Sequence, residues 1–218
     1  MAFELNIPDG LLGTGQMIIL PIPEGTEDLH LPDPTLLNYY RNRANRKIYI
    51  YGEITDELVD QNELIMQYNM EDAEKPVEER QPIFVYIFSE GGDLSATYSF
   101  IAMIEASKTP VITVNMGMAY SGGGLILISG HKRYCLRRSK ALIHQGSAGM
   151  QGTFSEIEEG QKSYRKSVEQ MKSYILEKTK IDEKLFNKNK AKDWWISDDE
   201  QVELGLVDAI VDSIEQIM

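Results

Sequence analysis

The chain alternates short apolar segments with segments of helical periodicity, and this alternation limits the folds open to it. Apolar and β-branched runs at residues 47–54, 83–88 and 110–117 predict strands, with helical patterns between them. Shorter runs at 132–136 and 140–145 predict two more strands. Strands that alternate with helices pair mostly in parallel, because each connection crosses back over the sheet. We therefore expect an α/β fold with a largely parallel sheet, both faces of which are covered by the intervening helices.

Charge and composition exclude several classes of partner. The 218 residues are 42% hydrophobic and 26% charged, which is typical of a soluble globular protein. A formal net charge of −12 repels phosphate backbones and anionic lipid, so neither nucleic acid nor a membrane is expected as a partner. No apolar stretch approaches the roughly 20 residues that span a bilayer, and the N-terminus lacks a signal-peptide pattern. These features predict a cytoplasmic protein.

Cysteine and histidine are scarce. Cys135 is the single cysteine, which excludes an intrachain disulfide. The three histidines are scattered, so no cluster has metal-ligand spacing and no metal is expected.

The patterns divide the chain into three parts. Residues 1–47 are rich in turn formers and predict an N-terminal arm or lid, residues 48–210 carry the α/β pattern, and residues 211–218 form a tail. Within the second part, a long amphipathic helix is predicted from Ser155 to about residue 178, with Ser155 and Glu158 in a capping-box pattern. Its apolar stripe could pack on the same domain or form an interface between subunits.

The segment "GMAYSGGG" at residues 117–124 places Ser121 where a buried strand turns into a helix. Backbone amides at a helix N-terminus lack intrahelical acceptors, and the following glycines allow a bound group to approach the backbone closely. Gly91 and Gly92 end the preceding strand and could supply a second amide, so the two strand ends could form an oxyanion hole. Alternatively, Ser121 caps the helix and its glycines serve tight packing.

A serine nucleophile needs a base, and His144 is the best-placed histidine because it ends an apolar strand. His131 lies in a predicted surface turn and His30 in the proline-rich N-terminal segment. A carboxylate must then orient the imidazole. Spacing alone does not choose among the candidates, which are Asp182, Asp193, Asp198, Asp199 and Asp208.

Several motifs from about residue 48 to residue 210 resemble one known family. They are "SEGGD", "GMAYSGGG", "RYCLRRSKALIHQ", "GMQGT", "KDWWIS" and "EQVELGLVDAIV", and they follow one another in the family's order. The family is the proteolytic subunit of the Clp protease, a serine peptidase of crotonase-like fold. The resemblance implies repeated β-β-α units, a largely parallel sheet and a protruding handle helix.

The resemblance also implies roles for individual residues. Ser121 becomes the nucleophile, His144 the general base and acid, and Asp193 the carboxylate that fixes the imidazole tautomer. The amides of Gly92 and Gly122 become the oxyanion hole. The backbone around Gly149, Gln151 and Gly152 would pair with an extended peptide substrate.

Assembly and partners follow from the same resemblance. The helix at 155–178 matches the family's handle, which implies heptameric rings, stacked as a tetradecamer, that enclose the active sites. Phe84 and Tyr86 fall where the family's AAA+ unfoldase docks; ATP would act only through that partner, and no cofactor is expected. Ala106 stands where an aromatic residue often lines the docking pocket, and the residues before Asp193 lack a charged pair that often links the two rings, so a single ring is an alternative.

Other functions remain open on the sequence alone. An acyl-CoA enzyme of the wider crotonase group would share the paired oxyanion amides but needs no serine–histidine couple. A non-catalytic ring subunit or scaffold would need no triad at all. A specialised, phage-type processing peptidase would fit the divergent N-terminal segment.

Overall fold

The computed structural model describes residues 34–146 and 149–218. Contacts divide the chain into two units, Met1–Tyr39 and Tyr40–Met218. Of the first unit, the structure describes only the opening turns of helix α1 (Pro34–Ala44). The second unit contains the sheet and every predicted site residue that the structure describes, and the rest of the description concerns this unit.

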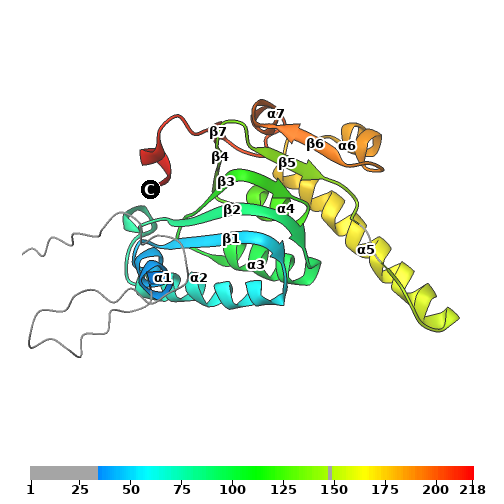
Figure 1. The fold of residues 1–218 in the computed structure, drawn as a ribbon, viewed down its shortest axis with the longest axis horizontal. Coiled ribbons are helices and arrows are strands. Elements are labelled where there is room, and N and C mark those ends of the chain that lie inside the picture. The colour runs from blue at the N-terminus through cyan, green and yellow to red at the C-terminus, as the bar shows by residue number, and fades with distance from the viewer. Residues whose placement is uncertain (1–33, 147–148) are drawn as a thin grey trace, which may run out of the picture. The chain divides into compact units, whose positions relative to one another are not determined.

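Seven strands form one sheet (Figure 1). The main path runs through neighbouring parallel strands, namely β1 (Lys47–Ile54), β2 (Ile83–Gly92), β3 (Val111–Tyr120), β4 (Lys132–Cys135) and β7 (Ala209–Ile210). Strand β5 (Lys140–Ile143) pairs in parallel with β3 and antiparallel with β6 (Trp194–Ser197). The predicted α/β fold with a largely parallel sheet is confirmed, whereas β6 was not anticipated.

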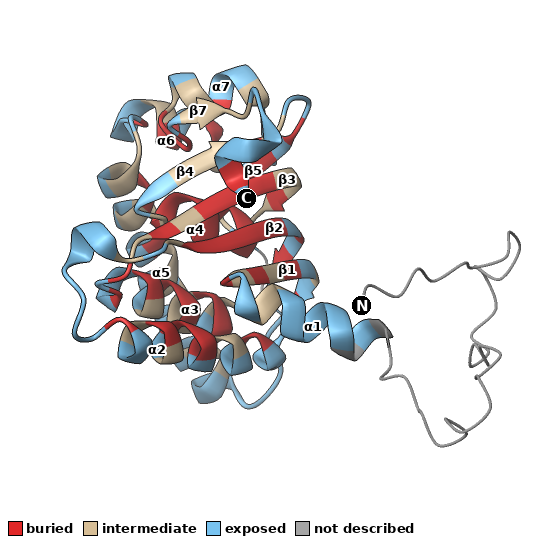
Figure 2. Cartoon of the chain, turned by 90° about the vertical axis from the view of Figure 1, so that its left-hand side faces the viewer, coloured by how far each residue is buried: buried red, intermediate tan, exposed pale blue. Residues whose placement is uncertain are grey.

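The crossover helices α2 (Asp60–Glu71), α3 (Leu94–Ala106) and α4 (Gly122–Ser129) pack together on one face of the sheet. The expectation that helices cover both faces is therefore wrong. Strands β1 to β4 follow one another in a single direction across the sheet, and right-handed crossovers then place every connecting helix on the same side. Helix α4 is buried along its whole length, and most residues of β2 and β5 are buried as well (Figure 2).

Alternate residues of β2 serve two different cores. Ile83, Val85 and Ile87 face the helices and belong to the main hydrophobic cluster. Phe84 and Tyr86 face the other way and form a smaller cluster with Val114 and Ile217. A side-chain period of two along the strand produces this division.

The smaller cluster is covered by the C-terminal turn η3 (Ile214–Ile217). Ile217 is buried, and its carbonyl oxygen accepts a hydrogen bond from the Tyr86 hydroxyl. Burial raises the pKa of Tyr86 to about 12. The turn is itself capped, because Ser213 accepts from the amide of Glu215 and Gln216 completes a capping box.

Helix α5 (Phe154–Lys178) is the predicted long helix, but its cap lies elsewhere. Thr153 accepts a hydrogen bond from the amide of Glu156, and the Glu156 carboxylate accepts from the amide of Thr153. The capping box predicted at Ser155 and Glu158 is therefore wrong. Thr153, which directly follows Gly152, has the same three-residue spacing to Glu156 and forms the box instead. Met171 and Ile175 anchor the C-terminal half in the core, and the N-terminal half extends beyond the sheet (Figure 1).

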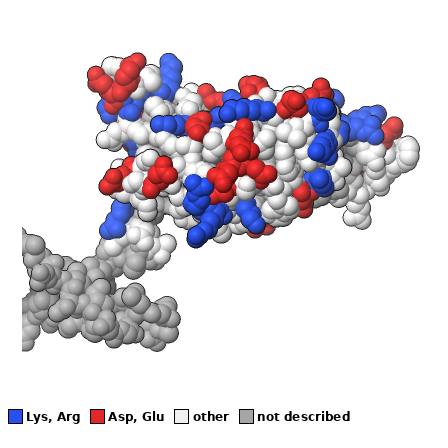
Figure 3. Space-filling model, turned by 90° about the horizontal axis from the view of Figure 1, so that it is seen from above, with Lys and Arg blue, Asp and Glu red and all other residues white. Residues whose placement is uncertain are grey.

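Short elements complete the unit. They are the 3-10 turns η1 (Asp56–Val59) and η2 (Val77–Glu79), and the helices α6 (Glu183–Asn189) and α7 (Asp198–Glu203). Acidic and basic side chains lie in small mixed groups on the face seen in Figure 3. Across residues 34–146 and 149–218, none of the helices combines the length and apolar character that crossing a bilayer needs.

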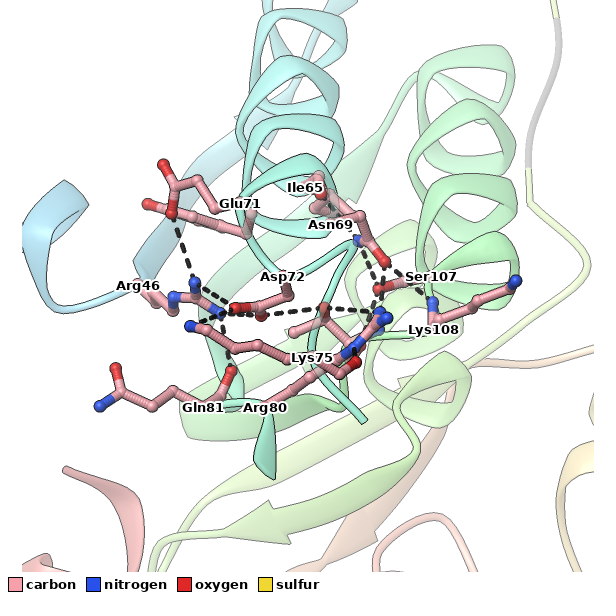
Figure 4. Close-up of polar contacts among 12 residues, drawn as sticks. Arg46, Ile65, Asn69, Glu71, Asp72, Lys75, Arg80, Gln81, Ser107 and Lys108 are labelled. Carbon is pink, nitrogen blue, oxygen red and sulfur yellow. Dashed lines mark hydrogen bonds and ion pairs between the residues drawn. The ribbon is translucent and has the colours of Figure 1, made fainter. Parts of the chain in front are cut away.

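A buried ion pair ties the start of β1 to the end of α2 (Figure 4). The guanidinium of Arg46 donates to both carboxylate oxygens of Asp72, one at 3.0 Å, and to the carbonyl of Gln81 at 3.0 Å. Lys75 and Thr109 also donate to Asp72, whose side chain is 0% exposed. The hydrogen bonds from Arg46, more than any other contact, hold the pKa of Asp72 well below its usual range.

Candidate active site

Strand β3 has two different partners along its length, and this fork creates the site. Residues Ile112–Asn115 pair with β4, whereas Met118–Tyr120 pair with β5. Directly after β3, the amide of Ser121 donates to the carbonyl of Leu142 at 2.9 Å. The end of β3 therefore lies beside the end of β5, and the residues that follow these two strands become neighbours.

Ser121 has a backbone conformation that few non-glycine residues adopt. Its φ of 51° and ψ of −118° place it in a strained region, at the N-cap position of α4. Its side chain makes no hydrogen bond to the helix amides. The hydroxyl instead lies 2.8 Å from Nε2 of His144. The alternative that Ser121 serves as a side-chain helix cap is therefore wrong.

The second ring nitrogen of His144 faces a carboxylate. Nδ1 lies 3.3 Å from Oδ1 of Asp193. The register of β5 with β6 explains this contact, because Ile143 pairs with Trp194 and the adjoining residues His144 and Asp193 are then opposite one another. The His144 side chain is 29% exposed and that of Asp193 is 59% exposed, so the acid end of this row is open to solvent.

The other candidate carboxylates are engaged elsewhere. Asp182 caps α6 through the amide of Leu185, Asp198 accepts from the amide of Arg138, Asp199 pairs with Arg137 at 2.9 Å, and Asp208 accepts from the amide of Arg133. These contacts leave Asp193 as the described candidate beside His144. No local pattern in the sequence singles out Asp193, because its place beside His144 comes from the pairing of β6 with β5.

The other two histidines were not favoured as the base. His131 is exposed, as expected for a turn, and its Nδ1 accepts a hydrogen bond from the amide of Val111 at 2.9 Å. Local desolvation and, to a lesser extent, Lys178 lower the pKa of His131. His30 lies outside the described residues.

Glycines at 91, 92 and 122 allow the backbone segments around Ser121 to approach one another closely. A Cβ added to Gly91 would meet the amide nitrogen of Gly122 at 2.8 Å, and one added to Gly122 would lie 3.6 Å from the amide nitrogen of Gly92. The predicted pair, Gly92 and Gly122, is therefore adjacent in space. Gly122 is the first residue of α4, where an amide has no acceptor within the helix. Such amides suit a developing negative charge.

A cleft of about 630 Å³ opens in front of this group. Its walls include Ser121, His144, Gly92 and Gly122, together with Tyr164 and Met171 from α5. Of the predicted substrate-binding residues, Gly149, Gln151 and Gly152 are exposed, and none of these described residues lines the cleft. Gly146, at the start of the same segment, does line it.

Two further predictions can be placed. Phe84 and Tyr86, predicted to receive a partner, are 7% and 4% exposed beneath the C-terminal turn η3. In the part of the chain that the structure describes, no group of three or more His, Cys, Asp or Glu side chains could hold a metal ion.

Comparison with known proteins bears on the family of the chain. The model of the Clp protease family matches residues 36–214. The chain is 33% identical over 187 residues to an ATP-dependent Clp protease proteolytic subunit 2 of Treponema denticola, covering 85% of this chain and 90% of the relative. It is 30% identical over 169 residues to the protein of the same name from Treponema pallidum, covering 77% and 82%. A peptidase of the serine type is thus indicated by the relatives, and the chain belongs to the Clp protease family.

Proposed function

We propose that this chain is an endopeptidase that hydrolyses peptide bonds through Ser121, His144 and Asp193. The observation that carries the proposal is the position of the Ser121 hydroxyl, which lies 2.8 Å from His144 Nε2 although the residue occupies a helix N-cap position. Ser121 attacks the peptide carbonyl, and His144 takes its proton and returns it to the leaving amine. Asp193 favours the tautomer with hydrogen on Nδ1, and water then releases the acyl group.

The oxyanion of the tetrahedral intermediate needs donors that are already in position. The amides of Gly92 and Gly122 are proposed for this role, because the Gly92 amide lies beside Gly122, which directly follows Ser121 and opens a helix. No cofactor takes part in this chemistry.

Substrate would bind as an extended strand along the segment that follows the base. The exposed backbone around Gly149, Gln151 and Gly152 can donate and accept hydrogen bonds with a peptide main chain. Recognition through the main chain makes few demands on side chains, which favours a broad range of protein substrates.

Assembly would use α5, whose N-terminal half is largely exposed and includes Phe154 at 83% exposure. We propose a homo-oligomer, a heptameric ring or a tetradecamer, that encloses the active sites in a chamber in the cytoplasm. Residues 1–47 would form a gate at the entrance of this chamber. An AAA+ unfoldase would feed the chamber and use ATP. Were it to dock on Phe84 and Tyr86, it would first have to displace the turn η3.

The test is covalent labelling with a fluorophosphonate, followed by mass spectrometry of intact protein and peptides. Wild type should be labelled at Ser121, and Ser121→Ala should not be labelled. Ser167→Ala is the matched control, because Ser167 lines the same cleft and its hydroxyl binds a backbone carbonyl of its own helix. Absence of labelling in folded, assembled wild type would overturn the proposal and favour a non-catalytic scaffold.

A further inference from the structure

The backbone beyond His144 leaves the sheet immediately. Strand β5 ends at Ile143, and the segment His144–Gly146 has no regular structure. Among the described residues, no backbone partner holds Gln145 or Gly146. The position of the imidazole therefore depends on what fixes this short segment.

A side chain from α5 provides such a contact. The hydroxyl of Tyr164 donates a hydrogen bond to the carbonyl oxygen of Gln145, at 3.0 Å. The contact is close on the next residue as well, since a Cβ added to Gly146 would lie 3.4 Å from the same hydroxyl oxygen. Gly146 has a φ of +79°, so the chain turns here in a conformation that favours glycine.

The helix that carries Tyr164 is packed into the main core. Met171 and Ile175, on the same helical face two and three turns further on, are 8% and 1% exposed in the main core. Tyr164 itself is half-buried and lines the same cleft as Ser121. The hydrogen bond therefore joins the loop of the base to a helix anchored in the core.

We propose that Tyr164 is a positioning residue for His144, which it holds in line with Ser121 by fixing the carbonyl of Gln145. Tyr164 takes no part in proton transfer. This inference rests on the proposed function, because it assigns His144 the role of base. It also connects α5 to the chemistry, so a shift of this helix would move the imidazole relative to the serine hydroxyl.

The variant Tyr164→Phe keeps the ring and removes the hydrogen bond. We expect both kcat for a fluorogenic peptide and the rate of fluorophosphonate labelling to fall about two- to tenfold, the range expected for one lost neutral hydrogen bond. KM should change less than about twofold, because the cleft wall is retained. Tyr174→Phe is the matched control, since this tyrosine lies on the same helix and its buried hydroxyl makes no hydrogen bond to the loop of the base.

A spectroscopic readout separates positioning from general loss of stability. With histidine labelled by ¹³C and ¹⁵N, the ring signals assigned to His144 should broaden or shift in Tyr164→Phe and stay unchanged in Tyr174→Phe. This readout also serves for any variant that assembles poorly, because it reports on the folded fraction.

The outcomes distinguish the two proposals. If wild type labels at Ser121 and Tyr164→Phe labels equally fast with unchanged His144 signals, the positioning role is wrong and the proposed function stands. If folded and assembled wild type is not labelled at all, both proposals fall.

Discussion

Oγ of Ser121 lies 2.8 Å from Nε2 of His144, although the two residues follow different strands and are 23 positions apart in the chain. The contact arises because β3 leaves β4 for β5 before it ends. A strained Ser121 backbone then aims the hydroxyl at the imidazole and away from the helix that it precedes. The site is thus a product of sheet pairing as much as of residue type.

Asp193→Asn should lower kcat by a factor on the order of 10³ to 10⁴, with little change in KM, because an amide no longer selects the reactive imidazole tautomer. Hydrolysis of a fluorogenic peptide measures both constants. Asp199→Asn is the control, since Asp199 is 73% exposed and pairs with Arg137. An equally large loss in Asp208→Asn, with Asp193→Asn unaffected, would show that the acid was assigned wrongly.

Asp72→Asn should lower the free energy of unfolding by about 3 to 5 kcal/mol, because it removes the buried counter-charge of the Arg46 guanidinium and leaves only the exposed carboxylate of Glu71. Urea unfolding at neutral pH provides the measurement. Glu71→Gln is the matched control: Glu71 contacts the same guanidinium at 3.3 Å but is 58% exposed, so about 0 to 1 kcal/mol is expected. Equal effects of the two substitutions would contradict the importance given to burial.

The same pair predicts a pH dependence. The pKa of Asp72 is depressed in the folded protein, chiefly by hydrogen bonds from Arg46, and is about 3.9 in an unfolded chain. Its contribution to stability is therefore fully present above the unfolded value and is lost as the pH falls toward the folded value. Wild type should lose more stability than Asp72→Asn when urea unfolding is repeated below about pH 4. Parallel losses in the two proteins would be inconsistent with this linkage.

Ile217→Ser should destabilise the C-terminal turn and uncover the aromatic face of β2. Ile217 is 5% exposed whereas Ile214, in the same turn, is 68% exposed, so Ile214→Ser is the matched control. We expect about 1 to 3 kcal/mol lost for Ile217→Ser and less than about 0.5 for the control. Fluorescence of 1-anilinonaphthalene-8-sulfonate should rise only in Ile217→Ser; a rise of the same size in both variants would argue against a specific cover.

Thr153→Ala should loosen the first turn of α5 by about 1 kcal/mol, because Thr153 supplies the cap. Ser155→Ala, two residues on, should have almost no effect. Hydrogen exchange of the amides at Glu156 and Ile157 would report the difference. Faster exchange in Ser155→Ala than in Thr153→Ala would return the cap to the position that the sequence first suggests.

Local patterns were sufficient for part of the site. Ser121 and Gly92 could be found because each ends or follows a buried strand, and His144 because it closes an apolar run. Asp193 could be chosen only through the family resemblance. Its contact depends on the antiparallel pairing of β5 with β6, and four residues of strand carry no signal of which partner they will find.

The errors in the fold have physical causes as well. Helix coverage of both faces was expected from the α/β pattern, but coverage depends on strand order, which periodicity does not reveal. The burial of Phe84 and Tyr86 under η3 depends on a contact between residues far apart in the chain, 131 positions in the case of Tyr86 and Ile217. The contact of the Tyr164 hydroxyl with Gln145 likewise depends on the tertiary structure.

The first half of β3 pairs with β4 in the main path of the sheet, whereas the second half pairs with β5 and leads into the candidate active site. Substitutions in β4 or β7 affect the pairing of the first half of β3. The distance between Ser121 and His144 depends instead on the pairing of β3 with β5. A slip of β5 by one residue would move His144 by about 3.3 Å and turn its side chain to the opposite face. A change of register along this strand is therefore discrete, and a slip of one residue removes the site altogether.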